Sequence, residues 1–407
     1  MCLLIDLNQK TRSFLMESVV IVGCARTPSG SLLGALSQVP AGELGAVAIA
    51  GALKQCAIDK SLISEVIMGN VLSAGVGQGP ARQASRKAGI PDHVGCTTIN
   101  KLCGSGLKAV MLGNDLIRAG SATSVVVGGM ESMSQAPYLL PTARSGARMG
   151  NTPCLDHMFH DGLEDSDTGK LMGVFAQEMA DTKNLSREAM DDFAIRSLKR
   201  AKTAQEKGWF KDEIVPVTVH TRKGSHEIIE DEQPKSANPD KIPTLKPAFK
   251  KPDGTITAAN ASSISDGAAA LVLMSESAAK QQGLQPIARI LGHASQAQHP
   301  SEFTIAPCGA IQKLLNSLDW QVKDVDLFEI NEAFAMVAMV PMIELEIDAD
   351  KVNIHGGACA LGHPIGATGA RLLVTLIHAL KRTQGKTGVA SLCIGGGEAT
   401  ALAIQVI

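Results

Sequence analysis

Aromatic residues are scarce in this chain of 407 residues, at 3% of the sequence, whereas glycine is abundant, with 40 residues. Small side chains in such numbers favour tightly packed layers and close backbone turns over a ligand groove lined with aromatic rings. Long apolar runs are also absent, because no run reaches membrane-spanning length although 45% of the residues are hydrophobic. We therefore expect a soluble protein without a membrane span, large enough for two or three domains.

An excess of charge of one sign is missing as well. The net charge is −2, which gives no basic footprint for nucleic acid and predicts no such partner. The nine cysteines are scattered and include no Cys-x-x-Cys pair, which favours reduced thiols and a cytoplasmic location. Residues 1–15 lack the apolar core of a signal peptide and the Arg/Ser-rich pattern of a transit peptide. We expect them to be an extension before the first strand.

Apolar runs of strand length alternate with segments of helical periodicity in two parts of the chain. In the first part, strands are expected at 19–24, 66–71, 96–100 (as a buried strand end) and 124–127, and helices at 42–56, 80–87 and 107–119. In the second part, strands are expected at 268–274, 324–330 and 388–394, and a helix at 368–381. This alternation predicts βαβ units and a parallel sheet that is covered on both faces.

The segment 134–264 has a different texture, with more charged residues and more prolines. Only one long helix stands out in it, at 186–207, and 213–219 alternates like an exposed strand. We interpret this segment as an insertion that forms a partly helical lid over the first half.

The two α/β parts share one order of motifs. The first part has Cys103-Gly-Ser-Gly, then a helix, a valine strand, two glycines and Glu131. The second part has Gly366-Ala-Thr-Gly369, then a helix, an apolar strand, three glycines and Glu398. We infer a duplicated α/β domain with its active site where strand ends of both halves meet. The predicted boundaries are 17–133 with 265–285 for the N-terminal half, 134–264 for the inserted loop domain and 286–407 for the C-terminal half.

Cys103 lies where a short β-branched strand turns into a helix, with glycines on both sides of Ser105. A thiol at a helix N-terminus faces unpaired N–H groups and the positive end of the helix dipole, and both favour the nucleophilic thiolate. The alternative is a small buried hydrophobic residue, which is what most free cysteines are.

Three further residues have the setting of catalytic groups. His363 lies between Gly362 and Pro364 in a glycine-rich loop and could act as the base for a thiol, or be a turn histidine bonded to backbone. Cys393 precedes three glycines whose N–H groups could hold an oxyanion, or it is a core cysteine. Asn331 could orient a water, or be a helix N-cap.

Two weaker patterns are disfavoured. Cys154, His157 and His160 have metal-like spacing, but no fourth ligand lies nearby, so we predict no metal site. The glycines at 75–79 lack the Lys-Ser/Thr of a P-loop and the spacing of a dinucleotide fingerprint.

Four motifs occur together between Val19 and the C-terminus: Asn-Lys-x-Cys-Gly-Ser-Gly, Asn-Glu-Ala-Phe, Gly-Gly-x4-Gly-His-Pro-x-Gly and Cys-x-Gly-Gly-Gly. With these motifs the sequence resembles the thiolases, and among them the acetyl-CoA acetyltransferases. The resemblance implies an α/β protein with a five-layered α-β-α-β-α fold, built from two duplicated halves with an inserted loop domain. It also implies a homotetramer composed of tight dimers.

The resemblance also implies a role for each catalytic residue. Cys103 would be the acylated nucleophile, His363 its base, and Cys393 the acid/base that handles the α-proton of the second acyl group. Asn331 would hold a water that, with His363, stabilises the enolate oxygen. The N–H groups of Cys103 and Gly395 would form the oxyanion hole.

Coenzyme A is implied as substrate and product, and no other cofactor is expected. Ser262 matches a position that contacts the pantetheine arm, and Arg222 resembles the site for the nucleotide phosphates. Met172 belongs to a segment that lines the acyl pocket, where Leu171 replaces a His or Pro of many relatives. This departure leaves the preferred chain length open.

The expected activity is the reversible condensation of two acetyl-CoA to acetoacetyl-CoA and CoA, in lipid metabolism. One alternative is a 3-ketoacyl-CoA thiolase that cleaves longer chains in fatty-acid degradation. Others are a non-catalytic CoA- or lipid-binding paralogue, which the presence of both cysteines, the histidine and the asparagine disfavours, and a metal-dependent hydrolase.

Overall fold

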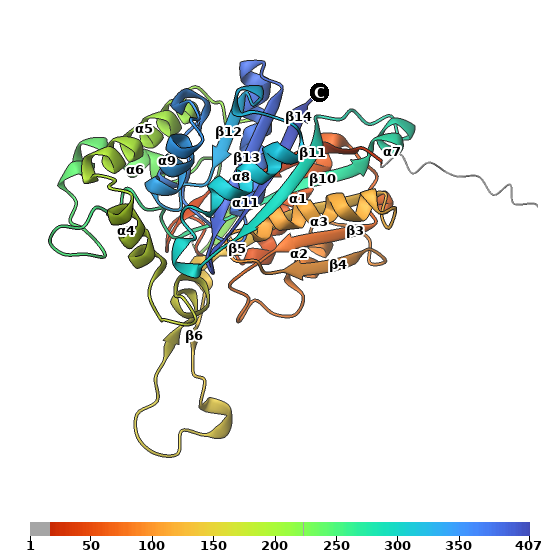
Figure 1. The fold of residues 1–407 in the computed structure, drawn as a ribbon. Helices are drawn as coiled ribbons and strands as arrows, with labels where there is room; N and C mark the ends of the chain where they lie inside the picture. Colours follow the sequence, from red (N-terminus) through yellow and green to blue (C-terminus); the bar gives the residue numbers. More distant parts are fainter. Residues whose placement is uncertain (1–16, 223) are drawn as a thin grey trace, which may run out of the picture.

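A mixed sheet of ten strands runs through the molecule in the computed structural model, which describes residues 17–222 and 224–407 (Figure 1). The N-terminal half contributes β1 (Val19–Arg26), β2 (Gly30–Ser31), β3 (Glu65–Gly69), β4 (Gly95–Ile99), β5 (Ser124–Ser132) and β10 (Ser265–Ser275). The C-terminal half contributes β11 (Ala288–Ala297), β12 (Leu327–Ile330), β13 (Thr387–Ile394) and β14 (Glu398–Val406). The expected extension at residues 1–15 lies outside the described residues.

The sheet is only partly parallel, so the prediction of a parallel sheet is wrong. Parallel pairing joins β3 to β4 and β5, and β12 to β13. The other pairs between these strands are antiparallel. Within the halves, β10 and β14 run opposite to their neighbours, and where the halves join, β1 and β11 run in opposite directions. The prediction that β4 is buried is also wrong: β4 is an edge strand with half-exposed side chains.

Both halves use the same strand order, which confirms the predicted duplication. The N-terminal order is β4-β3-β5-β10-β1, and the C-terminal order is β12-β13-β14-β11. In the N-terminal half, β4 lies beside β3. In the C-terminal half, a parallel bridge between Phe328 and Val352 occupies the corresponding position beside β12. The halves join edge to edge, where Val19, Val20 and Ile21 of β1 pair with β11.

Helices cover the two halves in layers. The helices α3 (Ser105–Arg118) and α11 (Thr368–Thr383) share one apolar core with strands of both halves. The outer helices are α1 (Ala41–Cys56) and α2 (Pro80–Lys87) on the N-terminal half, and α8 (Ala306–Ser317) and α9 (Ala335–Glu344) on the C-terminal half. Strand residues alternate between these cores, as Val125 and Val127 face α3 and Val126 faces α1. This arrangement is the expected five-layered fold.

The two central helices approach each other at their first turns. A Cβ atom on Gly106 would lie 2.8 Å from the backbone nitrogen of Ala370, and one on Gly369 would lie 2.3 Å from that of Leu107. Only glycine permits this contact. It brings the loop before α3, with Cys103, close to the loop before α11, with His363.

The segment 134–264 contains more regular structure than predicted. The expected long helix is α5 (Arg187–Glu206), and the Ser186 hydroxyl caps it by accepting a hydrogen bond from the N–H of Ala189. The helix α4 (Met172–Thr182) was not predicted. The expected exposed strand at 213–219 is wrong, because β8 (Val217–Thr221) begins later and buries Val217 and Val219.

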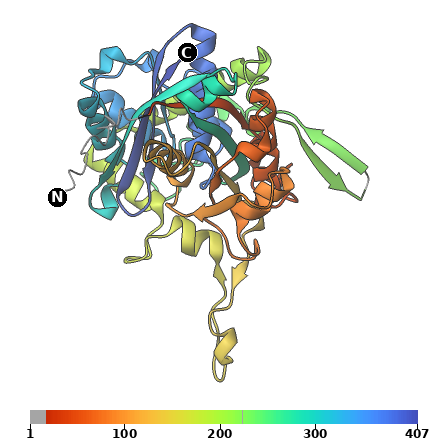
Figure 2. The ribbon, with the colours of Figure 1, turned by 90° about the vertical axis from the view of Figure 1, so that its right-hand side faces the viewer.

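The position of this segment also corrects a prediction. The helix α5 packs against α9 and α10 (Ala358–Leu361) of the C-terminal half, so the helical part does not form a lid over the first half (Figure 1). Two hairpins project from the molecule: β6 (Tyr138–Leu139) with β7 (Leu155–Asp156), and β8 with β9 (Gly224–Ile228) (Figure 2). The predicted domain boundaries at 133/134 and 264/265 remain predictions.

Two features of the described residues bear on the expectations from composition. The cysteines among the described residues are all free. None of the helices in the described ranges is both long and apolar enough to cross a membrane.

Candidate active site

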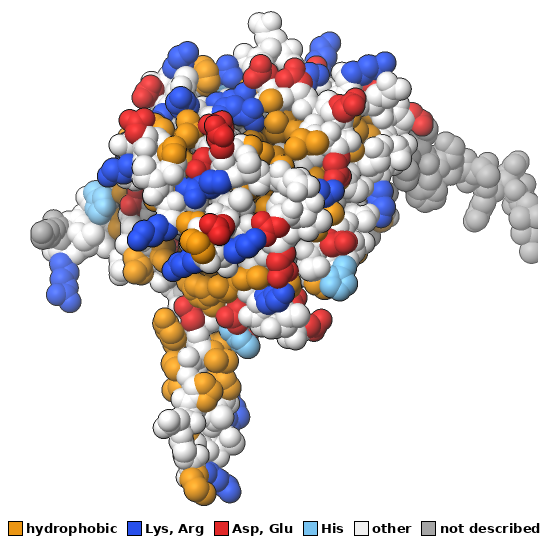
Figure 3. Space-filling view, turned by 60° about the vertical axis from the view of Figure 1, so that its left-hand side comes forward, with side chains coloured by type: hydrophobic (Ala, Val, Ile, Leu, Met, Phe, Trp, Pro, Cys, Tyr) orange, Lys and Arg blue, Asp and Glu red, His pale blue; other side chains and the backbone are white. Residues whose placement is uncertain are grey.

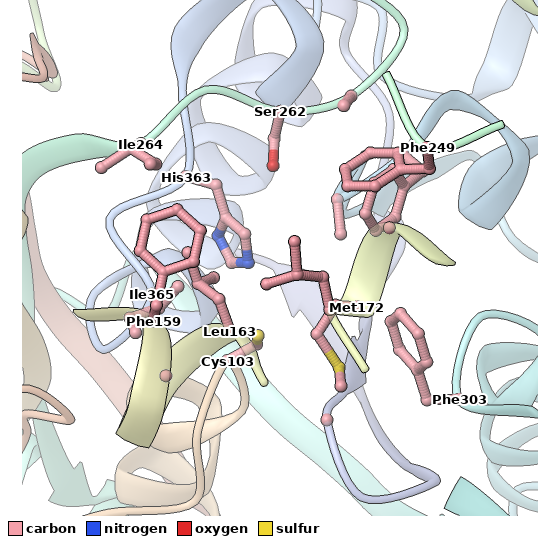
Figure 4. A pocket seen from close by; sticks show the side chains of 17 residues that line it. Cys103, Phe159, Leu163, Met172, Phe249, Ser262, Ile264, Phe303, His363 and Ile365 are labelled. Carbon is pink, nitrogen blue, oxygen red and sulfur yellow. The ribbon is translucent and has the colours of Figure 1, made fainter. Parts of the chain in front are cut away.

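A cavity of about 220 Å³ lies where loops of both halves meet the inserted segment. Five of the predicted site residues come together here, because the cavity is lined by Cys103, His363, Gly395, Ser262 and Met172. Figure 4 shows the Cys103 sulfur and the His363 ring directed into this space. Apart from these two and the Ser262 hydroxyl, the lining side chains are apolar.

The cavity wall is richer in aromatic rings than the composition suggests. Four phenylalanines line it: Phe159, Phe249 and Phe303, which Figure 4 labels, and Phe334. The expectation that scarce aromatics disfavour an aromatic ligand pocket is therefore wrong at this place. Sequence reasoning missed the first three because they come from separate segments and no motif joins them. Leu171 also lines the cavity, as expected.

The loop before α3 holds Cys103 in a constrained position. Leu102 adopts a left-handed backbone with φ of 47°, which is unfavourable for a branched side chain. The Ser105 hydroxyl fixes this turn, because it accepts a hydrogen bond from the N–H of Lys101 at 2.8 Å and donates to the carbonyl of Leu102 at 2.7 Å. Strain of this kind persists where the surroundings enforce it, as is common at active sites.

The Cys103 sulfur is a thiol in the resting protein. Burial raises its pKa to about 11, although the N–H groups of Gly395 and of Cys103 itself point at the sulfur and oppose this rise. The expected thiolate at the helix N-terminus is therefore wrong for the resting state, since desolvation outweighs the dipole. A nucleophilic Cys103 consequently needs a base nearby.

His363 has the form of that base. Its Nδ1 lies 2.6 Å from the Thr368 hydroxyl, and this hydroxyl donates its own proton to the carbonyl of Pro364 at 2.9 Å. The Nδ1–H must therefore be the donor, which leaves Nε2 without a proton. Burial, with Arg371 as a smaller cause, lowers the pKa of His363 to about 3, so the imidazole is neutral.

Asn331 follows β12 and is completely buried beside this imidazole. Its Nδ2 lies 3.3 Å from Nε2 of His363, whereas its Oδ1 has no hydrogen-bond partner within the structure. A buried amide oxygen without a partner is suited to accept from a bound water. The alternative of a helix N-cap is wrong, because Phe334 occupies the N-cap position of α9.

Cys393 lies beneath the cavity surface. It is the next-to-last residue of β13, is completely buried, and is not among the residues that line the cavity. Burial raises its pKa well above the ordinary value, and the neighbouring Cys103 adds to the rise. The two sulfurs are thus close enough to influence each other, although they come from different halves.

Arg222 and the metal-like triplet are not brought to this cavity. Arg222 is exposed at the turn of the β8–β9 hairpin. His157 uses both ring nitrogens within the protein, since Nδ1 lies 2.5 Å from Asp161 and Nε2 accepts from the N–H of Ala74 at 3.2 Å. Among residues 17–222 and 224–407, no group of His, Cys, Asp and Glu side chains is arranged to hold a metal ion.

Thr368 is a functional residue that sequence reasoning missed. Its hydroxyl fixes the tautomer of His363, yet in the sequence it appears only as a small residue of Gly366-Ala-Thr-Gly369. The spacing of five residues from His363 across Pro364 was the available signal, because a proline turn can fold such a residue back onto the ring.

Comparisons with known proteins agree with this geometry. Residues 19–277 match the thiolase N-terminal domain and residues 284–406 the thiolase C-terminal domain. A probable acetyl-CoA acetyltransferase of Dictyostelium discoideum is 49% identical, covering 96% of this chain and 94% of that protein. The acetyl-CoA acetyltransferase of Cupriavidus necator is also 49% identical, with 96% and 100% covered.

Solved structures give the same result. The Bacillus anthracis acetyl-CoA acetyltransferase superposes with a TM-score of 0.94 at 41% identity, covering 96% of this chain and 99% of that one. An Ascaris suum thiolase in complex with coenzyme A has a TM-score of 0.91 at 42% identity, with 96% and 100% covered. By sequence, strand order and the residues around Cys103, the chain belongs to the thiolase family.

Proposed function

We propose that this protein condenses two molecules of acetyl-CoA reversibly to acetoacetyl-CoA and CoA, through an acetyl group carried on Cys103. The observation that carries the proposal is the convergence of the Cys103 thiol and a neutral His363 on one apolar cavity. Relatives that are named acetyl-CoA acetyltransferases and are about half identical over nearly the whole chain support it.

The first step is acyl transfer. His363 takes the thiol proton of Cys103 on Nε2, and the sulfur attacks the carbonyl carbon of acetyl-CoA. The N–H groups of Cys103 and Gly395 donate to the oxyanion that develops. The carbon–sulfur bond to CoA then breaks, and the departing CoA thiolate takes the thiol proton of Cys393. One thioester has replaced another, Cys393 is now a thiolate, and His363 still holds the proton from Cys103.

The second step forms the carbon–carbon bond. The deprotonated sulfur of Cys393 takes an α-proton from a second acetyl-CoA, while a water on Asn331 and His363 stabilise the enolate oxygen. The enolate carbon attacks the acetyl carbonyl on Cys103, and the Cys103 sulfur leaves as acetoacetyl-CoA forms. His363 returns its proton to the Cys103 thiolate, and Cys393 keeps the α-proton, so all three groups regain their resting protonation states.

Coenzyme A serves in this scheme as substrate and product, with no other cofactor and no metal. Ser262 and Met172 line the cavity and would contact the pantetheine arm. Arg222 would bind the nucleotide phosphates from its exposed hairpin turn. A cytoplasmic role in lipid metabolism fits this chemistry.

The acyl intermediate can be tested directly. Incubation with acetyl-CoA should add one acetyl group to the peptide that contains Cys103, as measured by mass spectrometry after rapid acid quench. The variant Cys393→Ala should keep this adduct but lose condensation. An unmodified Cys103, or condensation that survives in Cys393→Ala, would contradict the proposed division of roles.

Chain length is tested by comparing cleavage of acetoacetyl-CoA with cleavage of a C8 ketoacyl-CoA. A cavity of about 220 Å³ closed by phenylalanines favours the short chain. Faster cleavage of the C8 substrate would instead indicate a 3-ketoacyl-CoA thiolase.

A homotetramer is the assembly we propose. The β6–β7 hairpin projects from the body and carries apolar side chains that are largely exposed, including Tyr138 at 67% and Met149 at 95% (Figure 3). Exposed apolar side chains on a projecting arm are typical of contacts between subunits. Light scattering should give four chains per particle, and shortening the loop 140–154 should reduce this number. A monomer of the full chain would contradict the proposal.

A further inference from the structure

We propose that Glu398 is a positioning residue for acyl transfer, because its ion pair with Lys101 holds the loop of Cys103 against the turn that carries Gly395. This inference rests on the proposed function, in which Cys103 accepts an acetyl group. Glu398 is the first residue of β14, and Lys101 lies two residues before Cys103. The ion pair joins Nζ of Lys101 to Oε2 of Glu398.

The two segments that this pair connects meet along their length. A Cβ atom on Gly104 would lie 2.3 Å from Cδ1 of Ile394, and one on Gly395 would lie 3.2 Å from Cδ1 of Leu102. The N–H of Gly395 points at the Cys103 sulfur. The oxyanion hole therefore has one N–H donor from each half of the molecule. The distance between the two donors depends on the contact between the Cys103 loop and the Gly395 turn.

The turn between β13 and β14 carries Gly395 between two fixed ends. Gly396 and Gly397 have φ of 84° and 89°. A Cβ atom on Gly396 would meet no atom within 4 Å, whereas one on Gly397 would lie 2.3 Å from the carbonyl oxygen of Gln298. Such a glycine turn is free to change conformation unless its ends are fixed. One end is fixed by the packing of Ile394 on Gly104. At the other end, the N–H of Gln298 donates to the carbonyl of Gly397 at 2.9 Å, and Glu398 pairs with Ala297 of β11. The side chain of Glu398 connects this second end to the loop of Cys103.

The duplicated fold contains a counterpart of this contact. Glu131 follows the glycines of β5, as Glu398 follows those after β13. Its carboxylate accepts a hydrogen bond from the N–H of Gly366 at 2.9 Å, in the loop that opens α11. In each half, a carboxylate thus contacts the loop that precedes the central helix of the other half.

The two contacts differ in a way that indicates their tasks. Glu131 is completely buried and also accepts from Asn70 and from the N–H groups of Val71 and Leu72, so it binds a fixed backbone frame. Glu398 is partly exposed, with 35% of its side chain accessible against 24% for Lys101. A partly exposed ion pair adds little to global stability, so its removal should affect local geometry more than folding.

The test compares acylation with alkylation of the same sulfur in Glu398→Gln, Lys101→Met and the double variant. Acylation is measured as the single-turnover release of CoA from acetyl-CoA, and alkylation as the rate of loss of the Cys103 thiol to iodoacetamide. Alkylation forms no oxyanion. We therefore expect each single variant to slow acylation about tenfold, as a partly misaligned oxyanion donor would, and to change alkylation less than about twofold.

Because both variants break one contact, the double variant should be no slower than the singles. Lys101→Arg, which keeps the charge, should retain most of the acylation rate. Glu276→Gln is the matched control, since it breaks the similarly exposed ion pair with Arg289 at the opposite end of the strands and should leave both rates unchanged.

Three outcomes would overturn the inference: acylation at the wild-type rate in Glu398→Gln, an equal loss of acylation and alkylation, or effects that multiply to about a hundredfold in the double variant. If the wild-type protein itself takes no acetyl group on Cys103, the proposed function fails, and the inference fails with it. Normal acylation of the wild type with unaffected variants would overturn the inference alone.

Discussion

The His363 imidazole is bonded on two sides, and each side has a separate task. The Thr368 hydroxyl accepts a hydrogen bond from the Nδ1–H. Asn331 contacts Nε2, the atom that accepts a proton from Cys103 in the proposed mechanism. The neutral resting state of both partners follows from their burial, which raises the pKa of the thiol and lowers that of the imidazole. Proton transfer must therefore be coupled to substrate binding, since a separated ion pair is unfavourable in the empty cavity.

Replacing Thr368 by valine should slow acylation by about 10- to 100-fold. The change keeps the side-chain volume but leaves the buried Nδ1–H without an acceptor, which costs about 1–3 kcal/mol, and it permits the unreactive tautomer. Rapid-quench measurement of Cys103 acylation gives the rate, and a thermal melt reports folding. Thr368→Ser is the control that retains the hydroxyl. Equal rates for the two variants would show that the hydrogen bond does not fix the tautomer.

The identities of the central residues could be predicted from sequence, but their ionisation could not. Cys103, His363 and Asn331 stand in recognisable glycine-rich or strand-end settings. The state of the thiol depends on how completely loops from the other half and from the inserted segment exclude water. Those contacts join residues hundreds of positions apart, and no local pattern encodes them.

At the scale of elements, the close approach of α3 and α11 places the two catalytic loops side by side. Gly106→Ala should destabilise the protein by about 1–3 kcal/mol, because its Cβ would overlap the backbone of α11 and force the helices apart. Chemical denaturation measures this loss. Gly95→Ala in β4 is the matched control, since a Cβ there meets no atom within 4 Å. Similar stabilities for both variants would contradict the contact.

Helices were predicted more accurately than strand directions. The bounds 80–87 of α2 and the Ser186 cap of α5 follow from local signals, namely proline in the first turn and a hydroxyl before the helix. The antiparallel return of β10 between β1 and β5 does not, because β10 follows an insertion of more than a hundred residues. Direction in a sheet is a property of distant pairing.

At the scale of the whole molecule, His355 joins the C-terminal half to the inserted segment. Its ring lies 5.2 Å from that of Trp209 and 5.8 Å from that of Phe210, and Nε2 accepts a hydrogen bond from Arg382 at 2.8 Å. Burial, and next the charge of Arg382, lower the pKa of His355 to about 3. The imidazole is therefore held neutral at this junction.

This neutral histidine should make the protein sensitive to acid. Between pH 6.5 and 3 the unfolded chain binds a proton at His355 that the folded chain does not, so stability is lost as the pH falls through this window. Relative to His355→Asn, the wild type should lose up to about 1.4 kcal/mol of unfolding free energy per pH unit below 6.5. Urea titrations of both proteins from pH 8 to 4.5 measure the difference, and parallel curves would contradict the assignment.

The pairing of β1 with β11 has a consequence for association with other chains. In either half alone, one of these strands would be an edge strand. Its unpaired N–H and C=O groups would be available to pair with a strand of another chain. Within one chain, the two halves cover these edges for each other over Val19–Ile21 of β1 and Ala288–Ile290 of β11. The pairing thus lowers the tendency of either half to associate edge to edge with other chains.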